Sequence, residues 1–236
     1  MANPFMPGAN LKSVPLEVDV GQRQYMLHVY NYMAGGLALT GIVAYFAATR
    51  GLYQAMLGTP IYWIVLLAPL GLVFFLSFRI EKMSLATAQL AFWVYAGLVG
   101  LSLAGIFLIY TGASIARVFF ITAGTFGAMS LYGYATKRDL THVGSFMFMG
   151  LIGIVIASLV NMFIASTALQ LTISVIGVIV FVGLTAWDTQ RIKAMYVQAD
   201  GAVVAGKKAI MGALALYLDF LNLFLMLMQL LGGRRR

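Results

Sequence analysis

The stretch ALALYLDFLNLFLMLMQLL, residues 213–231, decides the class of this protein. It ends an apolar run from Ala209 to Leu231 in which Asp219 is the only charged residue. At about 1.5 Å per residue, a helix over this run is long enough to cross a hydrocarbon core about 30 Å thick. Asp219 would lie near the middle of that core, where an ionised side chain is costly unless it faces a partner, a cavity or water. The stretch therefore predicts a membrane helix in which Asp219 faces a partner, a cavity or water and not lipid.

The composition of the whole chain agrees with a membrane location. Of the 236 residues, 62% are hydrophobic and 9% are charged, whereas soluble domains average about 25% charged residues. There is no cysteine, which excludes disulfides, thiolate catalysis and Cys-bound metal. The first apolar span begins near His28, after a polar segment that contains Glu17 and Asp19 and lacks a small-residue cleavage site. We therefore expect a retained helix rather than a signal peptide.

Seven apolar windows free of charge are long enough to cross a bilayer. The expected fold class is an all-α integral membrane protein with seven transmembrane helices and no extramembrane domain. Residues 1–27 would form a polar cytoplasmic segment, residues 28–232 the transmembrane domain, and residues 233–236 a basic tail. The windows are Tyr30–Ala48, Ile61–Phe78, Ala88–Tyr110, Val118–Ala135, Ser145–Ala165, Ala168–Trp187 and Ala209–Leu231.

The distribution of Lys and Arg predicts the orientation, because basic residues concentrate on the cytoplasmic side. With a cytoplasmic N-terminus, ten of the 15 basic residues lie inside and five, including Arg234–Arg236, lie outside. If the last helix re-entered instead of spanning, the tail would move inside and the distribution would become thirteen to two. The length of Ala209–Leu231 favours spanning. We therefore expect seven crossings and a cytoplasmic N-terminus, with re-entry as the open alternative.

The net charge of +8 does not indicate a nucleic-acid partner. The cations are scattered over membrane-flanking loops, where topology and anionic lipid headgroups account for them, and no soluble segment carries a basic patch interleaved with aromatic residues. The sequence also has no metalloprotease, phosphate-binding loop or persuasive Ser-His-Asp pattern. We expect membrane lipids as partners, no nucleic acid, no resident cofactor and no enzyme activity.

Small and polar residues share one stripe of the last helix. Gly212 and Ala215 would let another helix come close. Asp219 and Asn222 are three residues apart, so their side chains can contact the same partner. This stripe predicts that the last helix is central. The other acid that could meet Asp219 is Asp188, at the end of the sixth helix. Because the sixth and seventh helices are antiparallel, their meeting requires a tilted or displaced central helix.

Three motifs make the chain resemble a known family. They are TAGTFGAMSLYGYATKRDL (Thr122–Leu140), AWDTQRIK (Ala186–Lys193) and ALALYLDFLNLFLMLMQLLG (Ala213–Gly232). Together they resemble the Bax inhibitor-1 family, the transmembrane Bax-inhibitor-motif proteins, in a bacterial form, over about Gln22 to Gly232. The resemblance implies a multi-pass protein of the bacterial inner membrane, with six helices around a central seventh and a pH-sensitive leak of calcium across the membrane.

The resemblance also implies that Asp188 and Asp219 form a di-aspartyl pH sensor that closes a pore near its cytoplasmic side. Two carboxylates in a low-dielectric site cannot easily both ionise, so they hold one shared proton. Losing it leaves two adjacent negative charges, which repel each other or attract a cation. Calcium prefers about six to eight oxygen ligands. We therefore expect a transient calcium site at these two acids, with Asn222 as a pore-lining polar residue.

The second helix departs from the family pattern. Relatives with the leak carry an acid inside this helix, and a basic latch residue at its inner end reaches the acid of the sixth helix. Here Ile61–Phe78 contains no acid. The latch would be Arg79 or Lys82. Arg79 is closer to the helix, and a guanidinium pairs bidentately with a carboxylate, so Arg79 is the first candidate.

Plainer interpretations stay open for these residues. Asp219 can be a buried, protonated acid that locks helix packing, and Asp188 can be an interfacial ion-pair partner of Arg191. Arg79 and Lys82 can act only as topology signals. A second functional class is also open: a non-conducting regulator that binds another membrane protein, such as a membrane protease, through lipid-facing helices or the N-terminal tail.

Overall fold

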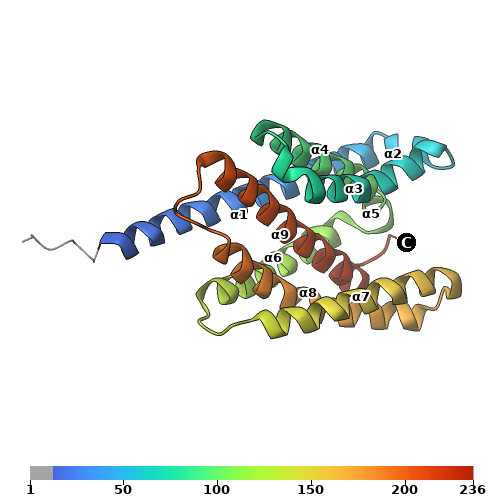
Figure 1. Cartoon of the computed structure of the whole chain (residues 1–236). Coiled ribbons are helices and arrows are strands. Elements are labelled where there is room, and N and C mark those ends of the chain that lie inside the picture. Colours follow the sequence, from blue (N-terminus) through green and yellow to red (C-terminus); the bar gives the residue numbers. More distant parts are fainter. Residues whose placement is uncertain (1–12, 236) are drawn as a thin grey trace, which may run out of the picture.

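The computed structural model describes residues 13–235, with side chains from residue 20 onward. In this range the regular structure is helical, apart from one isolated antiparallel bridge between Tyr110 and Arg234. The helices form a single bundle (Figure 1). Their bounds are α1 Ser13–Thr49, α2 Leu52–Met56, α3 Pro60–Arg79, the 3-10 helix η1 Ile80–Lys82, α4 Leu85–Leu103, α5 Ile106–Ile109, α6 Gly112–Ala135, α7 Thr141–Ile164, α8 Thr167–Ala194 and α9 Ala202–Leu231.

Seven segments of the described chain are long and apolar enough to cross a membrane, as the hydropathy pattern predicts. They are α1, α3 with η1, α4 with α5, α6, α7, α8 and α9. A bilayer offers no hydrogen-bond partners to a peptide group, so helices, which satisfy their own backbone, are the form that such segments adopt. The predicted fold class is confirmed.

The first and third spans differ in detail from the predicted windows. Helix α1 extends back to Ser13, well into the segment expected to be polar, and its membrane-length apolar part begins at Val20. Residues 1–12 of that segment lie outside the described residues. The window Ala88–Tyr110 is divided at Ala104, whose N–H donates to Leu101 O at 3.3 Å in the tighter 3-10 pattern before α5 begins.

Helix α9 is the central helix, as the stripe on its sequence predicts. It packs directly against α1, α4, α6 and α8, whereas α3 packs on α4 and α7 packs on α8 (Figure 1). Asp219 and Tyr217 are both buried, together with most of the apolar residues from Ala209 to Met228. In contrast, Leu76 is the one residue of α3 that is fully enclosed. Four helices therefore contact the central seventh directly, and α3 and α7 lie outside them with the largest exposed apolar faces.

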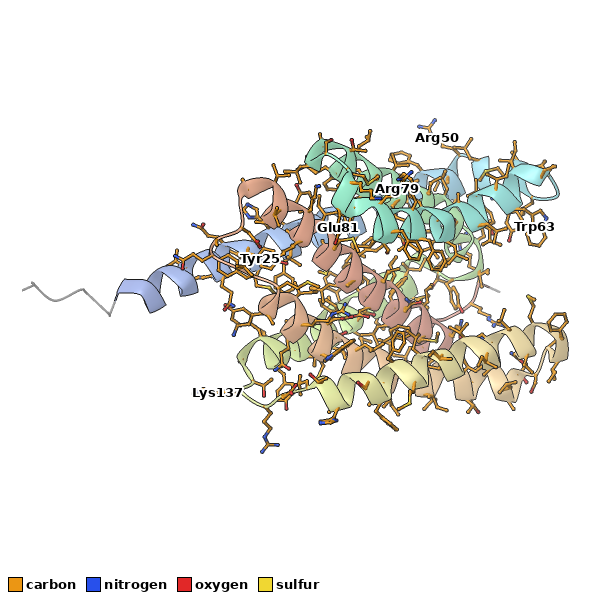
Figure 2. All side chains as sticks on the ribbon, in the orientation of Figure 1. Tyr25, Arg50, Trp63, Arg79, Glu81 and Lys137 are labelled. Atoms are coloured by element: carbon orange, nitrogen blue, oxygen red, sulfur yellow. The ribbon has the colours of Figure 1, made fainter. Side chains whose placement is uncertain are left out.

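The start of α1 and the end of α9 lie on opposite sides of the bundle. The side where α1 begins also carries the α6–α7 and α8–α9 connections, and we call it the N-terminal side; Lys137 lies there, while Arg50 and Trp63 lie toward the other side (Figure 2). The tail after α9 is held on that other, C-terminal side, where Arg235 N–H donates to Ile109 O at 2.9 Å and Gly233 N–H to Ser114 Oγ at 2.7 Å. Helix α9 thus spans the bundle rather than re-entering. The direction of the bundle in the membrane stays a prediction.

Candidate functional site

The register between α8 and α9 decides which of their side chains meet. The two helices are antiparallel, and α9 begins about two turns beyond the end of α8, which is the displacement that the sequence argument requires. In this register Asp219 comes opposite the turn of α8 that contains Thr185 and Asp188. The facing pairs that define the register are Lys208 with Met195, Gly212 with Ile192, Met226 with Gly177, and Gln229 with Ser174.

Asp188 and Asp219 are brought together between α8 and α9. Their carboxyl groups face each other closely enough to interact. Both residues are buried, with 8% and 5% of their surface exposed. One carboxyl oxygen of Asp219, Oδ2, is buried and has no hydrogen-bond partner among the described residues. Two carboxyl groups can form a hydrogen bond only if one of them carries a proton, so this geometry fits a protonated pair.

Arg191 supplies the positive charge of the site. Its Nη2 atom lies 2.8 Å from Oδ1 of Asp188, one turn earlier on α8. The guanidinium also lies 4.7 Å from the ring centroid of Trp187 and is 44% exposed, so solvent weakens the ion pair. Asp188 therefore contacts both Arg191 and Asp219. With one shared proton, the two carboxyls and the guanidinium are neutral in sum.

A crevice of about 220 Å³ lies between α3, α8 and α9 beside Arg191, and neither acid lines it. Arg191 lines it from α8, Ser77 from α3, and Gly212 and Ala215 from α9. Gly212 also lets α9 pack closely on α8, because a Cβ at this position would lie 2.8 Å from the Ile192 side chain. The stripe of small residues on α9 thus contributes to an opening beside the acid pair as well as to close helix packing.

Neither latch candidate reaches Asp188 in this structure. Arg79 ends α3 and is exposed, and Lys82 ends η1 and is exposed as well (Figure 2). Among the described residues neither forms an ion pair, and the cation beside Asp188 is Arg191. The latch stays a prediction for another state of the protein. The sequence analysis considered Arg191 as an ion-pair partner of Asp188, and the structure confirms that pair.

Asn222 does not join Asp219, although the two are three residues apart. It is half-buried, and its Nδ2 atom donates to Leu218 O on its own helix at 2.8 Å. Amide side chains within a helix commonly bond back to the preceding turn. A pore-lining role for Asn222 stays a prediction.

A second polar group lies where α7, α8 and α9 meet on the C-terminal side. Gln229 Oε1 accepts hydrogen bonds from Gln170 Nε2 at 2.6 Å and from Ser174 Oγ at 2.5 Å, and Asn161 Nδ2 donates to Gln170 Oε1 at 3.0 Å. These residues and Arg234 line a cavity of about 500 Å³. Neutral amides inside apolar windows were the available signal.

A third polar group, not foreseen from the sequence, joins three helices near the acid pair. The hydroxyl of Tyr30 on α1 hydrogen-bonds Ser130 on α6, and Ser130 Oγ lies 2.9 Å from Thr189 Oγ1 on α8. Thr189 directly follows Asp188. Isolated Ser and Thr residues in apolar helices are common, which is why this chain of hydroxyls could not be recognised from spacing.

The described residues offer few ligands to a metal ion. No group of three or more His, Cys, Asp or Glu side chains occurs among them. A calcium ion at the acid pair would thus meet only Asp188 and Asp219 as carboxylates, which is too few for a tight site without water. The donor set fits a passing cation, not a resident one.

Comparison with known proteins agrees with this architecture. A family model described as "Inhibitor of apoptosis-promoting Bax1" matches residues 22–236. The chain is 50% identical over 219 residues to inner membrane protein YbhL of Escherichia coli (strain K12), covering 91% of this chain and 94% of the relative. It is 55% identical over 218 residues to an uncharacterized protein of Rickettsia prowazekii (strain Madrid E), covering 92% of each. It is also 38% identical over 218 residues to an uncharacterized membrane protein of Streptococcus pyogenes serotype M3, covering 91% of this chain and 94% of the relative.

The motifs that suggested the resemblance lie on α6, α8 and α9, the helices that form the acid pair and its surroundings. With a family match over nearly the whole length and seven membrane-length helices, this chain is a multi-pass membrane protein that belongs to the Bax inhibitor family.

Proposed function

We propose that this protein is a non-enzymatic, pH-sensitive cation leak of the inner membrane, with calcium as its chief substrate, and that Asp188 and Asp219 form its proton sensor. The observation that carries the proposal is the contact between their two buried carboxyl groups, in which Asp219 Oδ2 lacks a partner. A buried polar atom without a partner is costly. Its persistence at the centre of a membrane helix is typical of a functional site.

The charge balance of the site gives the direction of the response. One shared proton and Arg191 neutralise the two carboxylates. As pH rises, that proton leaves and the site acquires one net negative charge. The carboxylates then repel each other or attract a cation, and either response changes the packing between α8 and α9. Leak through the protein would therefore depend on pH through this one proton.

The cavities on the two sides of the pair suggest the path. The crevice lined by Arg191, the ion-pair partner of Asp188, lies on the N-terminal side of the pair, and the cavity at Gln229 lies on the C-terminal side. Between them α9 buries apolar residues, among them Leu223 and Leu227. This apolar segment closes the path, so the structure corresponds to a closed state in the proposed cycle.

Calcium flux into liposomes that contain only this protein, measured across a pH series, tests the proposal. Asp219→Asn keeps the shape of the protonated acid but cannot ionise, so it should remove the pH dependence of the flux. Asp188→Asn should do the same, and the double change should add little, because either single change abolishes the shared proton. Retention of the wild-type pH profile by Asp219→Asn would refute the sensor.

Asp139→Asn is the matched control for these acid variants. Asp139 is exposed in the α6–α7 connection, and hydrogen bonds from the Thr141 hydroxyl and N–H lower its pKa, so it stays ionised at neutral pH. Its replacement should leave the pH profile of calcium flux unchanged. A profile that flattens equally in Asp139→Asn would show that surface charge, not the buried pair, sets the response.

The apolar segment of α9 and the small donor set also favour a second function. A protein of this fold that never opens would act as a non-conducting regulator, binding another membrane protein through the apolar faces of α3 and α7. Absence of calcium flux at every pH, in protein shown to be folded, would favour this regulator. Crosslinking to membrane proteins in cells, with replacements on the exposed faces of α3 and α7, would then identify the contact.

A further inference from the structure

A groove between α1 and α6 has no assigned occupant. Its volume is about 550 Å³, and nearly all of its lining is apolar. Met26 and Met33 line it from α1, and Phe126 and Leu131 from α6. Both walls belong to membrane-length segments, so the groove faces lipid. Among the described residues, the hydrogen bond between Tyr30 and Ser130 is the one that joins its two walls.

The N-terminal end of this groove is basic. Arg23 lines it from α1, and Tyr134 lines it from the last turns of α6. Lys193 of α8 lies behind Tyr134, with Nζ 4.4 Å from the ring centroid and 3.0 Å from Tyr134 O. One cation, Arg23, therefore lines the end of an otherwise apolar groove, and a second, Lys193, lies behind the Tyr134 wall at the same end.

An apolar channel with cations at the level of the bilayer surface is complementary to one kind of molecule. Acyl chains fill apolar space in a membrane without cost, and anionic headgroups are attracted to Lys and Arg near the surface. A neutral lipid would fill the apolar groove but would not be attracted to the cations. A protein helix would be too wide for a groove that a single hydrogen bond already crosses.

We propose that the α1–α6 groove binds one anionic phospholipid, with an acyl chain along Met26 and Met33 and the headgroup at Arg23 and Lys193. The bound chain replaces the side-chain packing that α1 and α6 lack. It thereby holds α1 against the Tyr30–Ser130–Thr189 chain of hydroxyls, which ends beside Asp188.

The chain provides a matched pair of variants to test this site. A Cβ at Gly127, on the groove wall, and a Cβ at Gly124, on the exposed side of the same helix, would each meet no atom within 4 Å. Gly127→Leu therefore fills the groove, and Gly124→Leu adds the same side chain to α6 outside it. The first carbon of either side chain meets no atom, so both variants should fold.

The experiment is native mass spectrometry of the full chain released from micelles that contain equal amounts of phosphatidylglycerol and phosphatidylcholine. The wild type and Gly124→Leu should retain one phosphatidylglycerol in preference to phosphatidylcholine, and Gly127→Leu should retain none. Arg23→Gln should lower that preference by about fivefold, because each basic residue near the surface contributes an attraction of that order.

Three results would overturn the lipid site. One is equal retention of the two lipids by the wild type. Another is retention of phosphatidylglycerol by Gly127→Leu at the wild-type level. The third is a wild-type dimer that Gly127→Leu converts to a monomer without loss of lipid, since the groove would then hold a second copy of the chain.

Discussion

Gly133 lets α6 approach the backbone of α8, and its replacement by alanine tests the packing that holds Asp188 in place. A Cβ at Gly133 would lie 2.1 Å from Ala186 O and 2.9 Å from its Cα, whereas ordinary contacts begin at 3.4 Å. Relieving the contact with Ala186 O thus needs a displacement of roughly 1.3 Å, the difference between 3.4 and 2.1 Å. The obstacle is backbone, which cannot rotate away as a side chain can.

The expected loss of stability follows from two opposing effects. Forcing a methyl group into closely packed structure costs about 1–3 kcal/mol. Replacing Gly by Ala within a helix gains up to about 1 kcal/mol. Gly133→Ala should therefore lower the free energy of unfolding by about 1–2 kcal/mol. Gly124→Ala, on the same helix with no atom within 4 Å of its Cβ, should leave that free energy unchanged or raise it.

Unfolding of the purified protein in mixed micelles with increasing dodecyl sulfate, followed by circular dichroism, measures both variants. Gly133→Ala should lower the dodecyl sulfate content at which half of the protein is unfolded, and Gly124→Ala should not lower it. Because Ala186 lies two residues before Asp188, Gly133→Ala should also alter the pH profile of calcium flux. Equal midpoints for the two variants would refute the close approach of α6 to α8 at Gly133.

Three further changes probe the cation of the site, the latch and the core. Arg191→Gln removes a charge that favours the ionised acid pair, so the pH at which calcium flux changes should move upward; an unmoved profile would exclude Arg191 from the site. Exchanging Arg79 and Asp188 should restore closure better than either single change if they form a latch in another state, whereas additive effects on leak would exclude their coupling. Tyr217→Phe removes the buried 2.6 Å hydrogen bond to Thr40 and should lower the free energy of unfolding by about 1 kcal/mol in the micelle titration, and an unchanged midpoint would contradict that contact.

Hydropathy was sufficient to predict the seven spans, and the stripe of small and polar residues predicted that the last helix is central. The bilayer requires long apolar helices, and an acid within α9 must face protein. Helix ends were less predictable, because polar residues such as those before Val20 continue a helix without an apolar signal. The break at Ala104 depends on local 3-10 hydrogen bonds that the composition of Ala88–Tyr110 does not reveal.

The acid pair was predictable as two residues but not as a contact. Its existence depends on the two-turn displacement of α9 relative to α8, which the connection between them allows but does not require. The ion pair of Asp188 with Arg191 was predictable, because the two residues lie three apart on one helix. The hydroxyl chain through Ser130 depends on which helix faces which. Three-residue spacing was a wrong guide for Asn222, whose amide bonds to its own helix. Contacts across helices were thus the part that sequence could not supply.

The shared proton between Asp188 and Asp219 is the central claim, and infrared difference spectroscopy of the protein in liposomes tests it most directly. Spectra would be recorded over the pH series used for calcium flux. A protonated carboxyl band should disappear from the wild type as pH rises through the range in which flux changes, and Asp219→Asn should lack this step. A carboxyl band that does not change in that range, or that titrates identically in Asp219→Asn, would contradict the account.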